Sequence, residues 1–187
     1  MVLKNSESHY GWVSIGLHWL IAVTIIALYA LGSYIVELSY YDPAYKTLPA
    51  IHKGVGVLLF GLIIARILWS TINSKPAPVG EVPTLQRRIA ILVHQLLYLL
   101  MLIIPITGYL ISTADGRPID VFGLFAVPAI DFGLNQQEEL AGTLHLWSAN
   151  TMAGLVALHA LAALKHHFIN RDQTLVRMFG RKQETTQ

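Results

Sequence analysis

The chain has 187 residues, of which 54% are apolar and only 13% charged, and its mean hydropathy is +0.53. A soluble domain usually carries about a quarter charged residues, so this composition excludes an ordinary soluble domain. The net charge of +2, with the charges clustered in short segments, gives no support for nucleic-acid binding, and the absence of cysteine excludes disulfides, thiolate-bound iron–sulfur clusters and thioether-attached haem.

Four segments are apolar enough to cross a bilayer as helices, which takes about 20 apolar residues each. They cover about 15–36, 51–72, 89–111 and 140–168. A cleavable signal peptide is not expected, because the first segment is too long and lacks a small-residue cleavage site after a basic start. We therefore expect an all-α, integral membrane four-helix bundle in which residues 1–187 form a single domain.

The distribution of Lys and Arg predicts the orientation, because basic residues near span ends concentrate in the cytoplasm. With the N-terminus inside, the inner side holds ten basic residues: Lys4, Arg66, Lys75, Arg87, Arg88, Lys165, Arg171, Arg177, Arg181 and Lys182. The outer side then holds three: Lys46, Lys53 and Arg117. Both termini are predicted to be cytoplasmic, and the outer loop 112–139 is expected to fold back onto the membrane surface.

Histidines inside the apolar segments pair by depth and by helix face. His145 and His159 are 14 residues apart, so they share one side of the fourth span at depths that differ by about 21 Å. In an antiparallel bundle His18 lies near the inner end of the first span and can meet His159, whereas His52 opens the second span at the outer end and can meet His145. His94 also lies on the inner side and competes with His18.

Two histidine pairs facing the interior of an apolar bundle are typical of haem with two axial imidazoles. Haem propionates need cations, for which Lys53 at the outer site and Arg66 at the inner site are candidates. Both cations could instead reach lipid headgroups. The small residues Gly54, Gly56 and Gly61 either admit a flat ring or allow close helix packing.

The chain resembles the bacterial cytochrome b561 family of inner-membrane dihaem proteins over nearly its whole length. The resemblance rests on His18-Trp19-Leu20, on Ile51-His52-Lys53-Gly54, and on the run Leu158–Phe168 with its H-x6-H-H pattern, followed by Asp172, Thr174-Leu175 and Arg177-Met178. It implies two b-type haems, ligated by His18 with His159 and by His52 with His145, in a bacterial inner membrane. The loop 112–129 is longer than in the shortest members.

Filled axial positions leave no open site for oxygen chemistry, so the expected function is electron transfer, with ubiquinone in the lipid as exchange partner. The resemblance further implies oxidation of superoxide with electrons passed to quinone. Lys46, Lys53 and Arg117 would attract this anion, but the outer side also carries an acidic excess that favours a cationic protein partner: Glu37, Asp42, Asp115, Asp120, Asp131, Glu138 and Glu139.

At the inner end, Lys165, His166 and His167 either donate hydrogen bonds or protons to a quinone or simply cap the span beside anionic lipid. Two alternative functions belong to other classes. One is a membrane-anchor subunit that passes electrons between a docked dehydrogenase, or a periplasmic protein, and quinone. The other is a His-lined transition-metal transporter, which the near absence of other polar residues in the spans disfavours.

Overall fold

A computed structural model describes residues 2–77, 79 and 83–180 of the chain. Its helices are α1 (Trp12–Ile35), α2 (Thr47–Ile72), α3 (Thr84–Thr113) and α4 (Gln137–Phe168), with a short 3-10 helix η1 (Val176–Phe179) and the strands β1 (Ile119–Val121) and β2 (Phe125–Val127). Each of the four α-helices is long and apolar enough to cross a membrane. The expected four-helix membrane bundle is therefore confirmed.

Each helix begins a few residues before the expected apolar segment, and α3 also ends beyond it, because hydropathy marks only the part of a helix that faces lipid. Helix α4 begins at Gln137 with Glu138 and Glu139 in its first turn and has Lys165, His166 and His167 in its last. This charge order is favourable for a helix dipole, which attracts acidic residues at the N-terminus and basic ones at the C-terminus. The polar first turn of α4 thus prolongs the helix before the expected segment, whereas its basic last turn lies within that segment.

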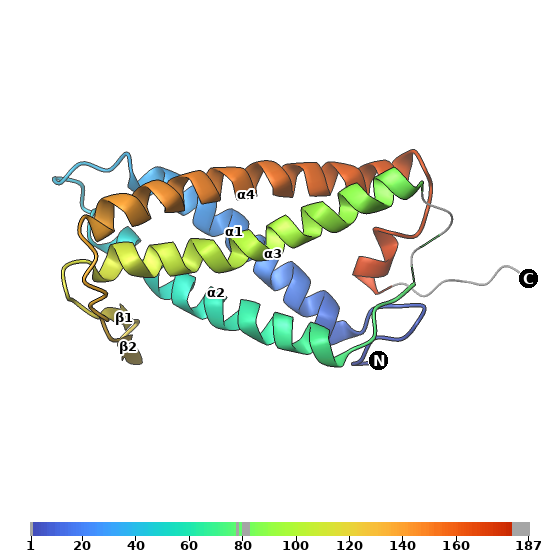
Figure 1. The fold of residues 1–187 in the computed structure, drawn as a ribbon, viewed down its shortest axis with the longest axis horizontal. Coiled ribbons are helices and arrows are strands. Elements are labelled where there is room, and N and C mark those ends of the chain that lie inside the picture. Colours follow the sequence, from blue (N-terminus) through green and yellow to red (C-terminus); the bar gives the residue numbers. More distant parts are fainter. Residues whose placement is uncertain (1, 78, 80–82, 181–187) are drawn as a thin grey trace, which may run out of the picture.

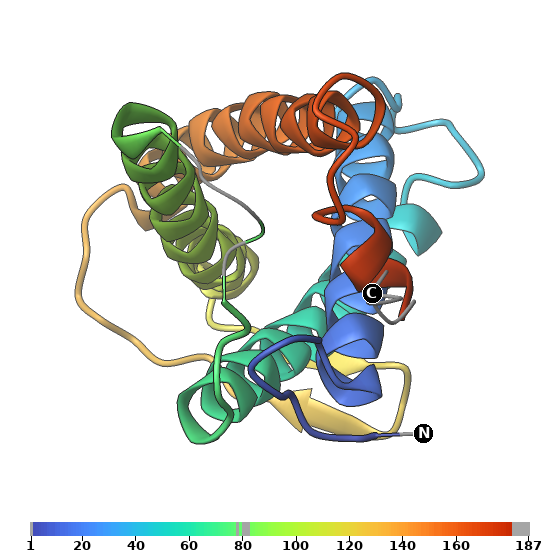
Figure 2. The same cartoon turned by 90° about the vertical axis from the view of Figure 1, so that its right-hand side faces the viewer.

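Successive helices are neighbours and run up and down around the bundle (Figures 1 and 2). Helix α1 packs on α2, α2 on α3 and α3 on α4, whereas α1 and α4 make few contacts. The N-terminal segment and η1 lie at the same end, which we call the inner end after the predicted orientation, and the β1–β2 hairpin lies at the other, the outer end (Figure 1). Two of the basic residues counted on the inner side, Arg181 and Lys182, lie outside the described residues.

The buried core forms an apolar layer at mid-height of the bundle. It consists of Ile21, Leu59, Ile63, Met101 and Met152. Met152 lies seven residues from both His145 and His159, about 10 Å along α4 from each. The central layer therefore separates an outer from an inner group of histidines.

The outer loop contains a two-stranded antiparallel hairpin that the sequence does not predict. Ile119 pairs with Val127 and Val121 with Phe125, and Val121 is fully buried. Phe122 and Gly123 at the turn both have positive φ, the backbone that tight hairpin turns require. The hairpin packs on α2, where a Cβ added to Gly54 would lie 2.8 Å from the Phe122 ring.

The C-terminal segment folds against the opposite end of the bundle. The Trp19 indole Nε1 donates a hydrogen bond to the Met178 carbonyl at 2.8 Å, and its ring lies 5.1 Å from that of Phe179. Arg177 donates from Nη1 to the Ala77 carbonyl at 2.7 Å. Element η1 is thus attached to both α1 and the α2–α3 connection.

Candidate functional site

The structure brings the expected histidine pairs together with nearly identical geometry. The ring centres of His18 (α1) and His159 (α4) lie 6.4 Å apart with 69° between ring planes, and those of His52 (α2) and His145 (α4) lie 6.3 Å apart, also with 69°. Because an imidazole nitrogen binds a first-row metal ion at about 2 Å and the ring centre lies about 1 Å beyond it, two rings on opposite sides of one ion have centres about 6 Å apart. Both pairs have this spacing.

The two pairs join helices that pack little against each other. Helix α1 makes few contacts with α4, and α2 lies diagonally across the bundle from α4 (Figure 2). Such a placement, at two levels on either side of the central layer, leaves the histidine rings facing each other across the bundle interior. It suits a planar group held between helices.

Glycines of the neighbouring helices make room for the outer pair. A Cβ added to Gly32 of α1 would lie 3.1 Å from Cε1 of His52, and one added to Gly108 of α3 would lie 3.2 Å from Cε1 of His145. These two glycines were not predicted for this role. Of the three glycines that were predicted, Gly54 lies against the Phe122 ring of the hairpin. A Cβ added to Gly56 or to Gly61 would have no atom within 4 Å.

The hydrogen bonds of His145 orient its ring for metal binding. Its Nδ1 donates to the Ile104 carbonyl at 2.9 Å and lies 3.2 Å from the Thr107 hydroxyl. Metal-binding histidines usually donate one ring N–H to a carbonyl in this way, which leaves the other nitrogen free as a ligand. The partner ring has a buried Nδ1, on His52, with no hydrogen-bond partner among the described residues.

His94 lies beside the inner pair, as the sequence suggested. Its ring centre is 5.1 Å from that of His159, with 89° between the ring planes. Its Nδ1 donates to the Ala90 carbonyl, its own helix neighbour, at 2.6 Å. His94 is exposed, whereas His18 and His159 are half-buried, and its separation from His159 is about 1 Å shorter than two axial ligands of one metal require.

Cations lie near both pairs. Lys53 is exposed at the outer end, next to His52. Arg66 is half-buried and acts electrostatically on both His18 and His159; its Nε donates to the Tyr98 hydroxyl at 3.3 Å. Within the described part of the chain, the buried Nη1 of Arg66 has no hydrogen-bond partner.

Arg177 is a buried cation that the sequence did not single out for a role at the site. It is only 9% exposed, and its Nε lacks a partner among residues 2–77, 79 and 83–180. Burial raises the pKa of Tyr10, whereas Arg177 and Arg66 act on it in the opposite direction, so both guanidinium groups lie near this phenol. Each of these two guanidinium groups has a buried N–H donor without a partner among the described residues, which fits an anionic partner at the inner end.

A mainly apolar cleft of about 410 Å³ lies between α3 and α4 near their inner ends. Its lining includes Lys165 and His166, two of the residues predicted for a quinone, together with Pro83, Leu85, Gln86, Ile89 and Ala162. The third predicted residue, His167, is not part of the lining; its ring lies 4.8 Å from that of Phe168.

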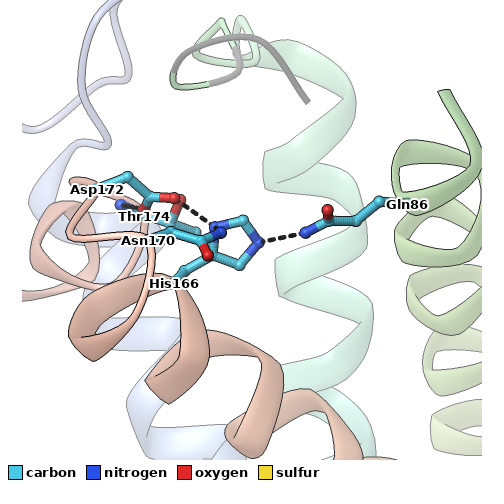
Figure 3. Close-up of polar contacts among 5 residues, drawn as sticks. All are labelled: Gln86, His166, Asn170, Asp172 and Thr174. Atoms are coloured by element: carbon cyan, nitrogen blue, oxygen red, sulfur yellow. Dashed lines mark hydrogen bonds and ion pairs between the residues drawn. The ribbon is translucent and has the colours of Figure 1, made fainter. Parts of the chain in front are cut away.

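His166 is the centre of a polar network in this cleft (Figure 3). Its Nδ1 is hydrogen-bonded to the Asp172 carboxylate, and its Nε2 lies 3.0 Å from the Gln86 amide nitrogen. Burial alone would raise the pKa of Asp172, but hydrogen bonds from Thr174 and His166 outweigh it and hold that pKa below its usual value. Gln86 and Asp172 were not predicted, because their contacts with His166 form only when α3 and the segment after α4 fold against it.

These residues fit a haem-binding protein with electron-transfer chemistry. Each pair supplies two opposed imidazoles, and no cluster of three or more metal-binding side chains occurs in the described ranges. A haem iron with two histidine ligands has no open position for oxygen, so it exchanges electrons. The unpartnered guanidinium atoms would suit the anionic propionates of a haem, and the cleft offers apolar walls with a few polar groups, as small-molecule sites usually do.

Comparison with known proteins identifies relatives over nearly the full chain. The sequence model of the family described as "Prokaryotic cytochrome b561" matches residues 9–181. "Cytochrome b561 homolog 2" of Escherichia coli strain K12 is 44% identical over 97% of this chain and 96% of its own. "Probable superoxide oxidase CybB" of Yersinia pestis is 32% identical over 92% and 97%, and "Cytochrome b561 homolog 1" of E. coli K12 is 28% identical over 94% and 99%.

Proposed function

Because the chain belongs to the prokaryotic cytochrome b561 family, whose members are membrane electron-transfer proteins that contain haem b, we propose that it holds two such haems and carries electrons between the two faces of a bacterial inner membrane. The observation that carries this proposal is the matched geometry of the two pairs, with ring centres 6.4 and 6.3 Å apart. His18 and His159 are the proposed inner axial ligands, and His52 and His145 the outer ones.

The chain's own residues set the properties of each site. Bound haem supplies a one-electron carrier. At the outer site Ile104 fixes the ring of His145 through its carbonyl, and Lys53 offers a cation to propionates. At the inner site Arg66 and Arg177 offer buried guanidinium donors, which favour a carboxylate because an unpaired buried cation is costly.

Quinone is the proposed electron partner in the membrane, and the α3–α4 cleft is its proposed site. The support is the cleft's position at the inner end, its apolar lining and the donors Lys165 and His166. The His167 ring lies against Phe168, so His167 is a weaker candidate for contact with quinone than Lys165 and His166. The basic residues at the end that holds the N-terminus support placing this end, and both termini, in the cytoplasm.

Superoxide is the proposed electron donor at the outer face, supported by the relative named as a probable superoxide oxidase. The outer charges favour a second candidate, a cationic periplasmic protein or docked dehydrogenase. Acidic residues outnumber basic ones there, and Arg117 is ion-paired with Asp115, its Nε donating at 2.7 Å. The paired Arg117 is less available to attract an anion.

Four measurements on the purified protein test the proposal. Pyridine extraction should count two haems per chain, and the visible spectrum should be that of low-spin b-type haem. Superoxide should reduce these haems, and a short-chain ubiquinone should reoxidise them under anaerobic conditions. A single haem would contradict the two-site assignment, and haems unreactive toward superoxide but reduced by a copurifying protein would favour the second donor.

A further inference from the structure

His166 continues the helix face that carries the proposed haem ligands of α4. His145, Met152, His159 and His166 follow at intervals of seven residues. Seven residues are nearly two full helical turns, so their side chains share one side of α4 and successive members are about 10 Å apart. The cleft around His166 is therefore the next level beyond the inner histidine pair.

The hydrogen bonds of His166 define how its ring can carry a proton. Its Nδ1–H donates to the Asp172 carboxylate, and its Nε2 accepts from the Gln86 amide at 3.0 Å (Figure 3). Asn170 Nδ2 lies 3.3 Å from the same Nδ1. The backbone N–H of Thr174 donates to the second oxygen of Asp172 at 2.8 Å, which holds the carboxylate in place. A second proton on the ring would sit on Nε2, which faces Gln86 and the cleft, and the Gln86 amide would then turn so that its oxygen accepts from this N–H.

We propose that the His166–Asp172 pair is the proton donor of the quinone site, with His166 giving the proton and Asp172 positioning it. The inference rests on the proposed function, because it assumes that quinone is reduced in this cleft. A carboxylate that accepts from one nitrogen of an imidazole fixes the ring and stabilises its charged form, as in other acid–base pairs. Lys165 and Asp172 are the charged groups that the described cleft and network present to His166; α3 presents the neutral Gln86.

The proposed reduction of quinone balances in both electrons and protons. Quinone becomes quinol by taking up two electrons and two protons, and the electrons arrive from the outer donor, with two superoxide ions each losing one electron to become dioxygen. As a quinone oxygen gains negative charge, the Nε2–H bond of the imidazolium breaks and an O–H bond forms. Asp172 remains a carboxylate, and the inner aqueous phase returns a proton to the ring for the second transfer.

Asp172→Asn tests the pair, because asparagine keeps an oxygen for the Thr174 N–H but loses the negative charge. The chemically reduced holoprotein is mixed anaerobically with a short-chain ubiquinone, and haem reoxidation is followed between pH 6 and pH 9. Without the carboxylate the imidazolium is less stabilised relative to the neutral ring, so we expect the reoxidation rate at pH 8 to fall about tenfold. The rate at pH 6 and the quinone concentration for half-maximal rate should stay near wild type.

Controls separate this inference from the proposed function. Glu7→Gln, at an exposed position of the N-terminal segment, should leave the pH profile unchanged, Asp172→Glu should restore most of the rate at pH 8, and His166→Gln should lower the rate at both pH 6 and pH 8. An unchanged profile for Asp172→Asn, or an equal loss at every pH, would overturn the proton-donor role. Wild-type haems that quinone does not reoxidise would instead overturn the quinone proposal itself.

Discussion

At the level of single residues, the proposed outer haem depends on both rings of one pair. Replacing His52 or His145 by Ala removes one of two axial ligands, so we expect loss of the outer haem and retention of the inner one. Haem stoichiometry and the low-spin absorption of each purified variant measure this. Two intact low-spin haems in either variant would show that the outer pair is misassigned.

The inner site poses a choice between His18 and His94, which both lie beside His159. The 6.4 Å separation of His18 from His159 resembles that of the outer pair, whereas His94 is 5.1 Å away. We expect His18→Ala to lose one haem and His94→Ala to keep both, measured by pyridine extraction. The reverse result would transfer the ligand role to His94.

A substitution at Gly108 tests whether binding of the proposed outer haem needs the space around the His145 ring as well as the ring itself. A Cβ there would already lie 3.2 Å from His145, so Gly108→Val should displace the ring, lower the outer haem content and destabilise the protein by about 1–3 kcal/mol. Gly154→Val in α4 is the matched control, because a Cβ at that position would meet no atom within 4 Å. Equal haem content in the two variants would contradict the role of Gly108.

At the level of elements, the position of the hairpin depends on one close contact with α2. Gly54→Ala would place a Cβ 2.8 Å from the Phe122 ring, whereas Gly56→Ala would meet no atom within 4 Å. Both changes improve helix propensity equally, by about 1 kcal/mol, so this effect cancels in the comparison. We expect faster proteolytic cleavage of the outer loop in Gly54→Ala only, because only there does the new methyl group meet the Phe122 ring. Equal cleavage rates would mean that Phe122 does not hold the hairpin on α2.

The sequence predicts the helices and histidine pairs but not the elements that close the two ends. Hydropathy and helical periodicity are local signals, and they place four spans and assign His145 and His159 to one face. The hairpin strands have three residues each, too few for an alternating pattern to be recognised. Contacts such as Gln86 with His166, 80 residues apart, come from tertiary packing, which no local pattern encodes.

At the level of the whole molecule, the predicted orientation rests on the basic residues at one end. A reporter that is active only outside the cytoplasm should be silent when fused after Gln187 and active when fused after Asp131 in the outer loop. The opposite activities would reverse the topology and place the α3–α4 cleft on the outer face.

The proposed reaction would move charge across the membrane because of the central layer of Ile21, Leu59, Ile63, Met101 and Met152. The five side chains of this layer are apolar, so the layer itself offers electrons a short passage between the outer and inner histidine levels and contributes no group to a hydrogen-bonded chain for protons. Electrons that enter outside would then meet protons taken from inside, which makes turnover electrogenic. Moving one electron fully inward against an inside-negative membrane potential costs about 2.3 kcal/mol per 100 mV. A membrane potential should therefore slow turnover, and collapsing that potential should restore the rate.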